Sequence, residues 1–208
     1  MITMRPVLEI RSLEGFGLWP VAEVAPFSFL PLGRALAPDE IGTAVMALAA
    51  CNDVDPGEEH PPRPADPLGG FLHGLLTMDP LFAAGGLRVA DTVTGVVLVP
   101  GCCCGLEDRG DWWEVLDGTG PAGFGHGPSP LAERHGDTVL LTVDCEEEGS
   151  PVIEVAVPEL RRLLAEAERD LTDFRDAASL WAARQLPSHA GQLSEAITRA
   201  LQLPRDAA

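Results

Sequence analysis

The stretch "PELRRLLAEAERDLTDFRDAASLWAARQL", residues 158–186, decides the fold because it predicts one long helix with a single apolar side. Its apolar residues are spaced alternately four and three positions apart, which places them on one stripe of a helix. At a rise of 1.5 Å per residue, the helix is expected to be about 40 Å long. The stripe consists of Leu160, Leu164, Ala167, Leu171, Phe174, Ala178 and Trp181.

A shorter helix is predicted directly after this one. Pro187 ends the long helix, and Ser188 is a candidate N-cap for the next. The apolar side of the second helix consists of Leu193, Ile197 and Leu201. Two arrangements are open, a helical hairpin packed on a sheet of the same chain and a coiled coil with a second copy. Fewer than four clean heptads and the short second helix favour packing within the chain.

The segment before the long helix predicts a β-hairpin. Residues 137–145 alternate between polar and apolar side chains, and residues 152–157 form a second strand-like run. The connecting "EEEGS", residues 146–150, is short enough for an antiparallel pair. Helices are predicted at residues 38–51 and 71–84. The fold class is therefore α+β, with a mainly antiparallel sheet covered by helices and a C-terminal helical hairpin.

The chain has 208 residues, and we expect one compact domain over residues 1–208. The proline-rich, acidic stretch at residues 52–69 is expected to be a mobile loop. No apolar run reaches the roughly 20 residues that a membrane span requires. The N-terminus lacks the pattern of a signal peptide, and five cysteines are an odd number for a disulfide framework. These features predict a cytoplasmic protein with reduced thiols and no membrane contact.

The formal net charge is -18, and the chain contains no lysine. Such a chain would be repelled by a phosphate backbone, so we predict no nucleic-acid partner. Two interpretations of the acidity are open, a general contribution to solubility and attraction to a cationic protein partner. The glycine-rich segment at residues 118–130 satisfies neither the phosphate-loop nor the dinucleotide pattern, so no cofactor is predicted. The oligomeric state is left open.

Three consecutive cysteines at residues 102–104 stand between two glycines. The order G-x-C-x-G is typical of a nucleophile elbow, in which Cys103 would be the nucleophile and a histidine the base. His126 is our first choice of base, with His135 and His189 as alternatives and Asp137 as an orienting carboxylate. Against this, the elbow belongs to a parallel sheet, whereas the downstream sequence predicts an antiparallel hairpin.

Two other interpretations of the cysteine segment are open. Cys102 and Cys104 would lie on the same side of an extended chain and could bind a metal ion together with His126 or His135. Alternatively, the cysteines are small apolar residues that fill tight space at the end of a buried strand.

The segment "LEDRGDWWEVLDG", residues 106–118, surrounds two tryptophans with carboxylates. Adjacent residues of a helix or strand do not share a face, so we expect one tryptophan at the surface. An aromatic ring flanked by carboxylates suits an arginine of a partner protein. The alternative is that one ring lies in the core and the other covers the surface. The predicted binding residues are Asp108, Asp111, Trp112, Trp113 and Glu114.

The segments "PGCCCGLED", residues 100–108, and "GHGPSPLAER", residues 125–134, carry a resemblance. With the tryptophan pair, the hairpin and the long helix, they resemble a group of uncharacterised actinobacterial proteins that have a GCCxGLED segment and a GHDPSP-like loop. Gly127 stands where that loop has aspartate. The layout is also loosely similar to bacterial immunity-type proteins. We therefore predict a non-catalytic acidic interaction protein, with an immunity or regulatory partner of a cationic protein as the form considered. The alternatives are a thiol-dependent enzyme using Cys103 and a cysteine-based metal-binding protein.

Overall fold

The structure, a computed structural model, describes residues 1–12, 14–54 and 61–204. The residues group into two compact units: unit 1 comprises Met1–Val7 and Ala84–Asp170, and unit 2 comprises Leu8–Ala83 and Leu171–Ala208. The single domain expected over residues 1–208 stays a prediction. Within the described part of the chain, no helix combines the length and the apolar character that crossing a bilayer requires.

The α+β class predicted from the sequence is confirmed. The described residues form two antiparallel sheets, with strand orders β2-β1-β3-β4 and β5-β6-β7-β8. The helices α1 to α5 accompany them, and α4 and α5 form the C-terminal helix pair. The segments whose side chains alternate between polar and apolar are strands, and the segment with apolar residues three and four positions apart is a helix.

In unit 1, the first six residues of β1 (Ile2–Ile10) lie beside β3 (Gly85–Asp91), which pairs antiparallel with β4 (Val97–Leu98). The Thr3 hydroxyl donates to the Ala90 carbonyl across this pair. After β4 the chain enters the cysteine segment, so β4 determines the direction in which that segment leaves the sheet.

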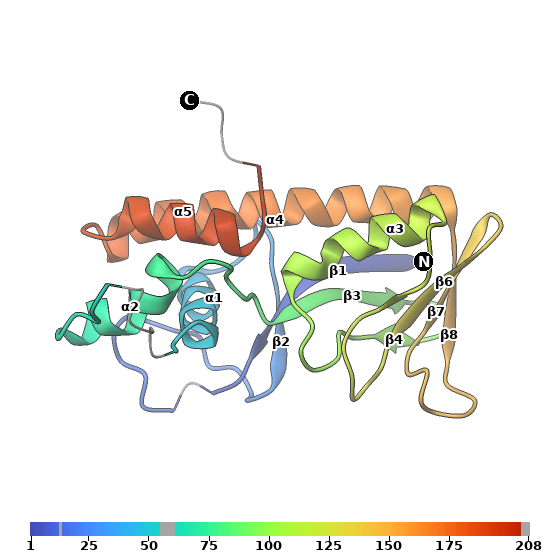
Figure 1. The fold of residues 1–208 in the computed structure, drawn as a ribbon, viewed down its shortest axis with the longest axis horizontal. Coiled ribbons are helices and arrows are strands. Elements are labelled where there is room, and N and C mark those ends of the chain that lie inside the picture. The colour runs from blue at the N-terminus through green and yellow to red at the C-terminus, as the bar shows by residue number, and fades with distance from the viewer. Residues whose placement is uncertain (13, 55–60, 205–208) are drawn as a thin grey trace. The chain divides into compact units, whose positions relative to one another are not determined.

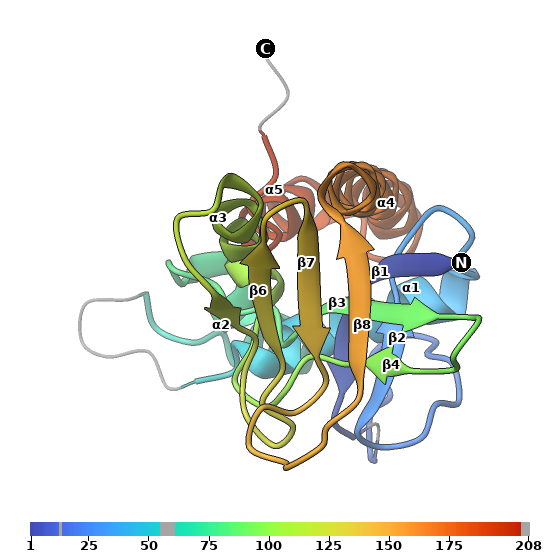
Figure 2. The ribbon, with the colours of Figure 1, turned by 90° about the vertical axis from the view of Figure 1, so that its right-hand side faces the viewer.

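The second sheet also belongs to unit 1, and Figure 2 shows β6, β7 and β8 side by side. It consists of β5 (Ala122–Gly123), β6 (Leu131–His135), β7 (Thr138–Thr142) and β8 (Val152–Ala156). The predicted hairpin is confirmed as the β7–β8 pair. Its connection is longer than expected because β7 ends at Thr142, after which Asp144 accepts from the Glu146 N–H and its own N–H donates to Ser150.

Three helical segments complete unit 1. The 3₁₀ helix η1 (Leu106–Gly110) leads into α3 (Asp111–Asp117), which ends at Gly118 with a left-handed φ of 73°. The first half of α4 (Val157–Gln185) belongs here as well. Its apolar stripe is buried in the way the spacing predicts, with Leu160, Leu164 and Ala167 each at most 2% exposed.

Unit 2 is mainly helical, with the short strand β2 (Ser28–Pro31) beside the end of β1. Helix α1 (Pro38–Cys51) has the predicted bounds. Helix α2 (Pro67–Thr77) starts earlier and ends earlier than the predicted 71–84. The reason is local: the Asp66 carboxylate caps the helix by accepting from the Gly69 N–H, and Pro67 occupies the first helical position.

This early start also shortens the loop predicted at residues 52–69, whose last residues belong to α2. Residues 55–60 of that loop lie outside the described residues, so its expected mobility stays a prediction. At the beginning of the loop, buried Asn52 holds the chain in place, because its side chain donates to the Leu48 and Phe82 carbonyls and accepts from the Phe82 N–H.

The helical hairpin lies in unit 2, where the second half of α4 runs beside α5 (Ala190–Ala200) (Figure 1). The hydroxyls of Ser179 and Ser194 hydrogen bond across the pair at 2.7 Å. The N-cap position of α5 is His189, one residue after the predicted Ser188. The apolar residues predicted for the two helices are buried: Leu171, Phe174, Ala178, Trp181, Leu193, Ile197 and Leu201.

Candidate metal centre

The cysteine segment lies in unit 1 and is paired with the loop that carries His126. Cys102 forms an isolated antiparallel bridge with His126. The Cys102 N–H donates to the His126 carbonyl at 2.7 Å, and the His126 N–H donates to the Cys102 carbonyl at 3.2 Å. Directly opposite residues of an antiparallel pair project to the same side, so the thiol of Cys102 and the imidazole of His126 are neighbours.

Gly101 permits this pairing because the two backbones approach very closely. A Cβ atom on Gly101 would lie 2.1 Å from the Pro128 carbonyl oxygen and 2.6 Å from the His126 nitrogen. Gly125, on the opposite segment, has a left-handed φ of 95°, and a Cβ there would lie 2.6 Å from the Cys102 carbonyl oxygen. These glycines therefore have a steric function: they let the two segments pair at the level of Cys102.

Cys103 has an unusual backbone conformation that brings its thiol to the same place. Its φ is 65°, in the left-handed region that residues with a side chain seldom adopt. In an extended chain, Cys102 and Cys103 would project to opposite faces. Here the Sγ atoms of Cys102 and Cys103 are 3.5 Å apart.

Together these contacts gather three potential metal ligands. One donor atom each from Cys102, Cys103 and His126 lies within 4.8 Å of the others, and all three residues are exposed. A zinc ion at about 2.3 Å from both sulfurs, 3.5 Å apart, would have an S–Zn–S angle of roughly 100°, near the tetrahedral value. The spacing of the sulfurs is therefore suitable for one shared metal ion.

Cys104 lies elsewhere. It is buried, and its sulfur lies near the Cα of Gly86, where an added Cβ would be 3.3 Å away. Its carbonyl accepts from the Gly85 N–H, which ties this residue to the start of β3. Burial, followed by the charges of Asp108 and Glu107, raises the pKa of the Cys104 thiol to about 12.

These positions correct the predicted ligand pair of Cys102 and Cys104. The prediction assumed an extended chain, and the left-handed turn at Cys103 exchanges the two neighbours: Cys103 joins Cys102, and Cys104 points inward. The description of a small apolar residue that fills tight space fits Cys104 alone. His126, and not His135, is the histidine beside the thiols.

The elbow prediction is matched only in part. Cys103 does have a left-handed conformation and lies near His126. However, the chain continues into the 3₁₀ helix η1 instead of an α-helix, and the sheets are antiparallel. Asp137 lies in the turn after β6, whereas His126 lies before that strand. The five residues of β6 span about 16 Å, so Asp137 and His126 lie toward opposite ends of the strand. His189 belongs to unit 2.

One of the two tryptophans, Trp112, packs against the segment that carries His126. Trp112 is 1% exposed and stacks on Phe124, with ring centroids 4.1 Å apart. The Phe124 carbonyl in turn accepts from the Gly101 N–H at 2.8 Å. Trp112, predicted as a binding residue, is therefore a core residue, and its neighbour lies over the surface. The stack and this hydrogen bond connect the core to the backbone that pairs Cys102 with His126.

Trp113 is half-buried, and an arginine of the same chain already lies against it. The Arg161 guanidinium carbon is 5.7 Å from the ring centroid, and Arg161 also lies 3.9 Å from the Asp117 carboxylate. Asp108 and Glu114 are exposed, and Asp111 is half-buried. Burial, followed by the charges of Asp108 and Glu114, raises the pKa of Asp111.

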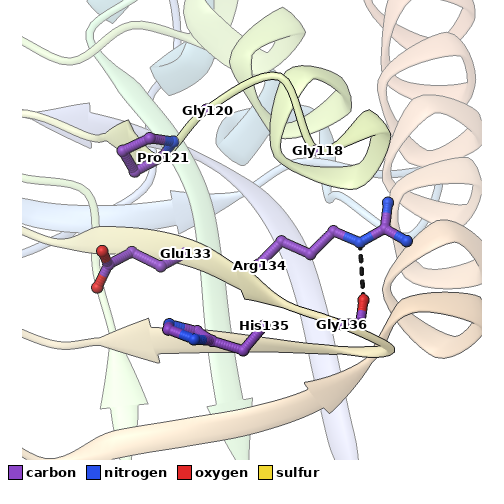
Figure 3. Close-up of a pocket in the computed structure, with 7 residues that line it drawn as sticks. All are labelled: Gly118, Gly120, Pro121, Glu133, Arg134, His135 and Gly136. Atoms are coloured by element: carbon purple, nitrogen blue, oxygen red, sulfur yellow. Dashed lines mark hydrogen bonds between the residues drawn. The ribbon is translucent and has the colours of Figure 1, made fainter.

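A separate hollow of about 420 Å³ lies between the end of α3 and the β6–β7 turn (Figure 3). Glu133 and His135 point to one side of it, and Arg134 points to the other. The Arg134 guanidinium is engaged, because it donates to the carbonyls of Gly136 and Leu116. The lining side chains therefore do not converge on a common point, and His135 has no part in the thiol cluster.

The sequence analysis missed the pairing of adjacent thiols, Cys102 with Cys103. The glycines on both sides were a signal for a sharp turn, but the sequence does not indicate which cysteine takes the left-handed conformation. In comparisons with known proteins, no family model, no curated protein and no solved structure matches this chain.

Proposed function

We propose that this protein binds a soft metal ion through the thiolates of Cys102 and Cys103 and the imidazole of His126. The observation that carries the proposal is the meeting of three donor atoms within 4.8 Å on two separate segments of the chain. Two sulfurs and one imidazole nitrogen are the donors preferred by zinc and by monovalent copper. The net charge of -18 favours the approach of cations.

A cytoplasmic location is part of the proposal, because thiols stay reduced there and are available to a metal. All five cysteines are thiols in this structure. We assign neither a nucleic-acid partner nor a membrane to the protein. The group of actinobacterial proteins that the sequence resembles is consistent with this location and carries no activity over to the chain.

The interaction function predicted from the tryptophan segment has less support. Trp112 is buried, and Arg161 lies against Trp113 where an arginine of a partner was expected. A cationic partner would have to replace Arg161. The carboxylates of Asp108 and Glu114 are exposed, so binding through charge alone stays a prediction.

A thiol enzyme would use two of the same residues, Cys103 and His126. The cluster supports this alternative less well than metal binding, because among the described residues it includes no carboxylate that could orient the imidazole. The two functions differ in a simple observable, which is stoichiometric metal binding as opposed to selective alkylation of one thiol.

The test is a titration of the reduced, metal-free protein with zinc in competition with a chromophoric chelator. We expect one ion per chain and a loss of binding of at least tenfold in Cys103→Ala and in His126→Ala, because even the loss of a group that only orients a metal ligand costs about 10–100-fold in affinity. Cys145→Ala is the matched control, since Cys145 is also exposed but lies outside the cluster.

Equal loss in Cys145→Ala, or no stoichiometric binding in the wild type, would overturn the proposal. Rapid alkylation of Cys103 in a protein that binds no zinc would instead favour the thiol enzyme.

A further inference from the structure

The candidate centre supplies fewer donors than a zinc ion ordinarily takes. Zinc in proteins is usually tetrahedral, and a site with three protein ligands keeps one position for a further ligand. Among the described residues, the histidines, cysteines and carboxylates that gather here are Cys102, Cys103 and His126. The adjacent thiol, Cys104, is buried against the start of β3 and points away.

The side of the centre that carries the thiols is open. Cys102, Cys103 and His126 are all exposed. Beside the imidazole, a Cβ added to Gly127 would meet no heavy atom within 4 Å, so the neighbouring loop leaves space there. A ligand from solution can therefore approach without displacing protein.

Charge decides which ligand fits. A divalent ion with two thiolates and a neutral imidazole has no net charge, so an anionic fourth ligand would make the centre negative. The chain already carries a formal net charge of -18. Repulsion therefore disfavours anionic donors and also a second copy of the same acidic chain.

We propose that the zinc-loaded centre keeps its fourth position open to a small neutral donor from solution, for which imidazole is the probe. This inference rests on the proposed metal-binding function and specifies the ligand of that same centre. A neutral donor completes the tetrahedron without adding charge, and its size suits a site that is open to solvent.

The experiment uses the full chain loaded with cobalt(II), whose visible spectrum reports the ligands around the metal. Imidazole and azide are titrated separately at low ionic strength. We expect imidazole to shift the visible bands with saturable, one-to-one dependence and to bind more than about tenfold tighter than azide, with a difference that shrinks at high salt. Cys104→Ala is the matched variant, and its cobalt spectrum should equal that of the wild type.

Three outcomes would overturn the inference: no spectral change with imidazole, azide binding as tight as imidazole, or an altered cobalt spectrum in Cys104→Ala. Formation of a cobalt-dependent dimer in sedimentation would overturn it as well, because a second copy would then fill the position. Failure of the proposed function is distinct, since the protein would then develop no thiolate–cobalt bands at all.

Discussion

The Sγ atoms of Cys102 and Cys103 lie 3.5 Å apart because Cys103 has a left-handed backbone, with φ at 65°. Neighbouring residues of an extended chain cannot meet in this way. The antiparallel bridge to His126 adds the third donor. The geometry of the candidate centre therefore depends on one backbone dihedral and one pair of backbone hydrogen bonds.

The strain at Cys103 can be measured with two small substitutions. A left-handed conformation costs a residue with a Cβ about 1–2 kcal/mol, whereas glycine adopts it at almost no steric cost. We expect Cys103→Gly to have a higher free energy of unfolding than Cys103→Ala, by about 1 kcal/mol. Both variants lack the thiol and should bind zinc equally weakly. Chemical denaturation measures the difference, and equal stability would show that the left-handed turn is not retained.

Gly101 should tolerate no side chain. A Cβ would lie 2.1 Å from the Pro128 carbonyl oxygen, which is backbone and cannot rotate away. We expect Gly101→Ala to cost about 2 kcal/mol of stability, as overpacking typically does, and to weaken zinc binding by moving His126. Gly110→Ala is the control, because a Cβ there meets nothing within 4 Å and the backbone is helical. Similar stability of the two variants would contradict the close approach.

Asp91 predicts a dependence of stability on acid pH. Hydrogen bonds from the Val93 N–H and then from the Thr94 hydroxyl lower the pKa of Asp91 from 3.8 to about 2. The folded state thus favours the charged form, so the stabilisation is full above the unfolded pKa near 4 and is lost as the pH falls through the folded value. The melting temperature of the wild type should exceed that of Asp91→Ala at neutral pH, and the difference should shrink as the pH falls toward 2.

For Asp111 we expect the opposite dependence of stability on pH. Burial, followed by the charges of Asp108 and Glu114, raises its pKa, so ionisation of Asp111 costs stability as the pH rises through its folded pKa. We expect Asp111→Asn to unfold at a higher temperature than wild type at pH 7, and this gain to disappear in acid below the unfolded pKa. Glu148→Gln, at an exposed position of the β7–β8 connection, is the control. A gain that is independent of pH would refute the electrostatic cause.

In unit 2, Asn52 should be a sensitive position. It is 3% exposed. Its side chain donates hydrogen bonds to the Leu48 and Phe82 carbonyls and accepts one from the Phe82 N–H. Removing it leaves these groups without a partner, so we expect Asn52→Ala to cost about 2 kcal/mol, the usual penalty for such groups. Val54→Ala, at an exposed position, should change stability by less than about 0.5 kcal/mol. Urea denaturation of both variants measures the contrast.

The sequence by itself determined the elements whose signal is local. The spacing of apolar residues predicted α4 and the burial of its stripe, and strict alternation predicted the β7–β8 pair. Helix α1 was predicted with its observed bounds because proline and two carboxylates mark its start. Such patterns require no knowledge of distant residues, since each side chain is placed by the period of its own element.

Only the tertiary structure decided which cysteine faces which neighbour. The conformation of Cys103 depends on the pairing of Cys102 with His126, which lies on a distant segment of the chain, and that pairing needs two close backbones and the stack of Trp112 on Phe124 behind them. The prediction from sequence spacing assumed an extended backbone at residues 102–104, and on that assumption Cys104 was predicted as a ligand beside Cys102. The left-handed backbone at Cys103 changes the directions of the side chains here, so that the Cys103 thiol lies beside Cys102 and Cys104 is buried.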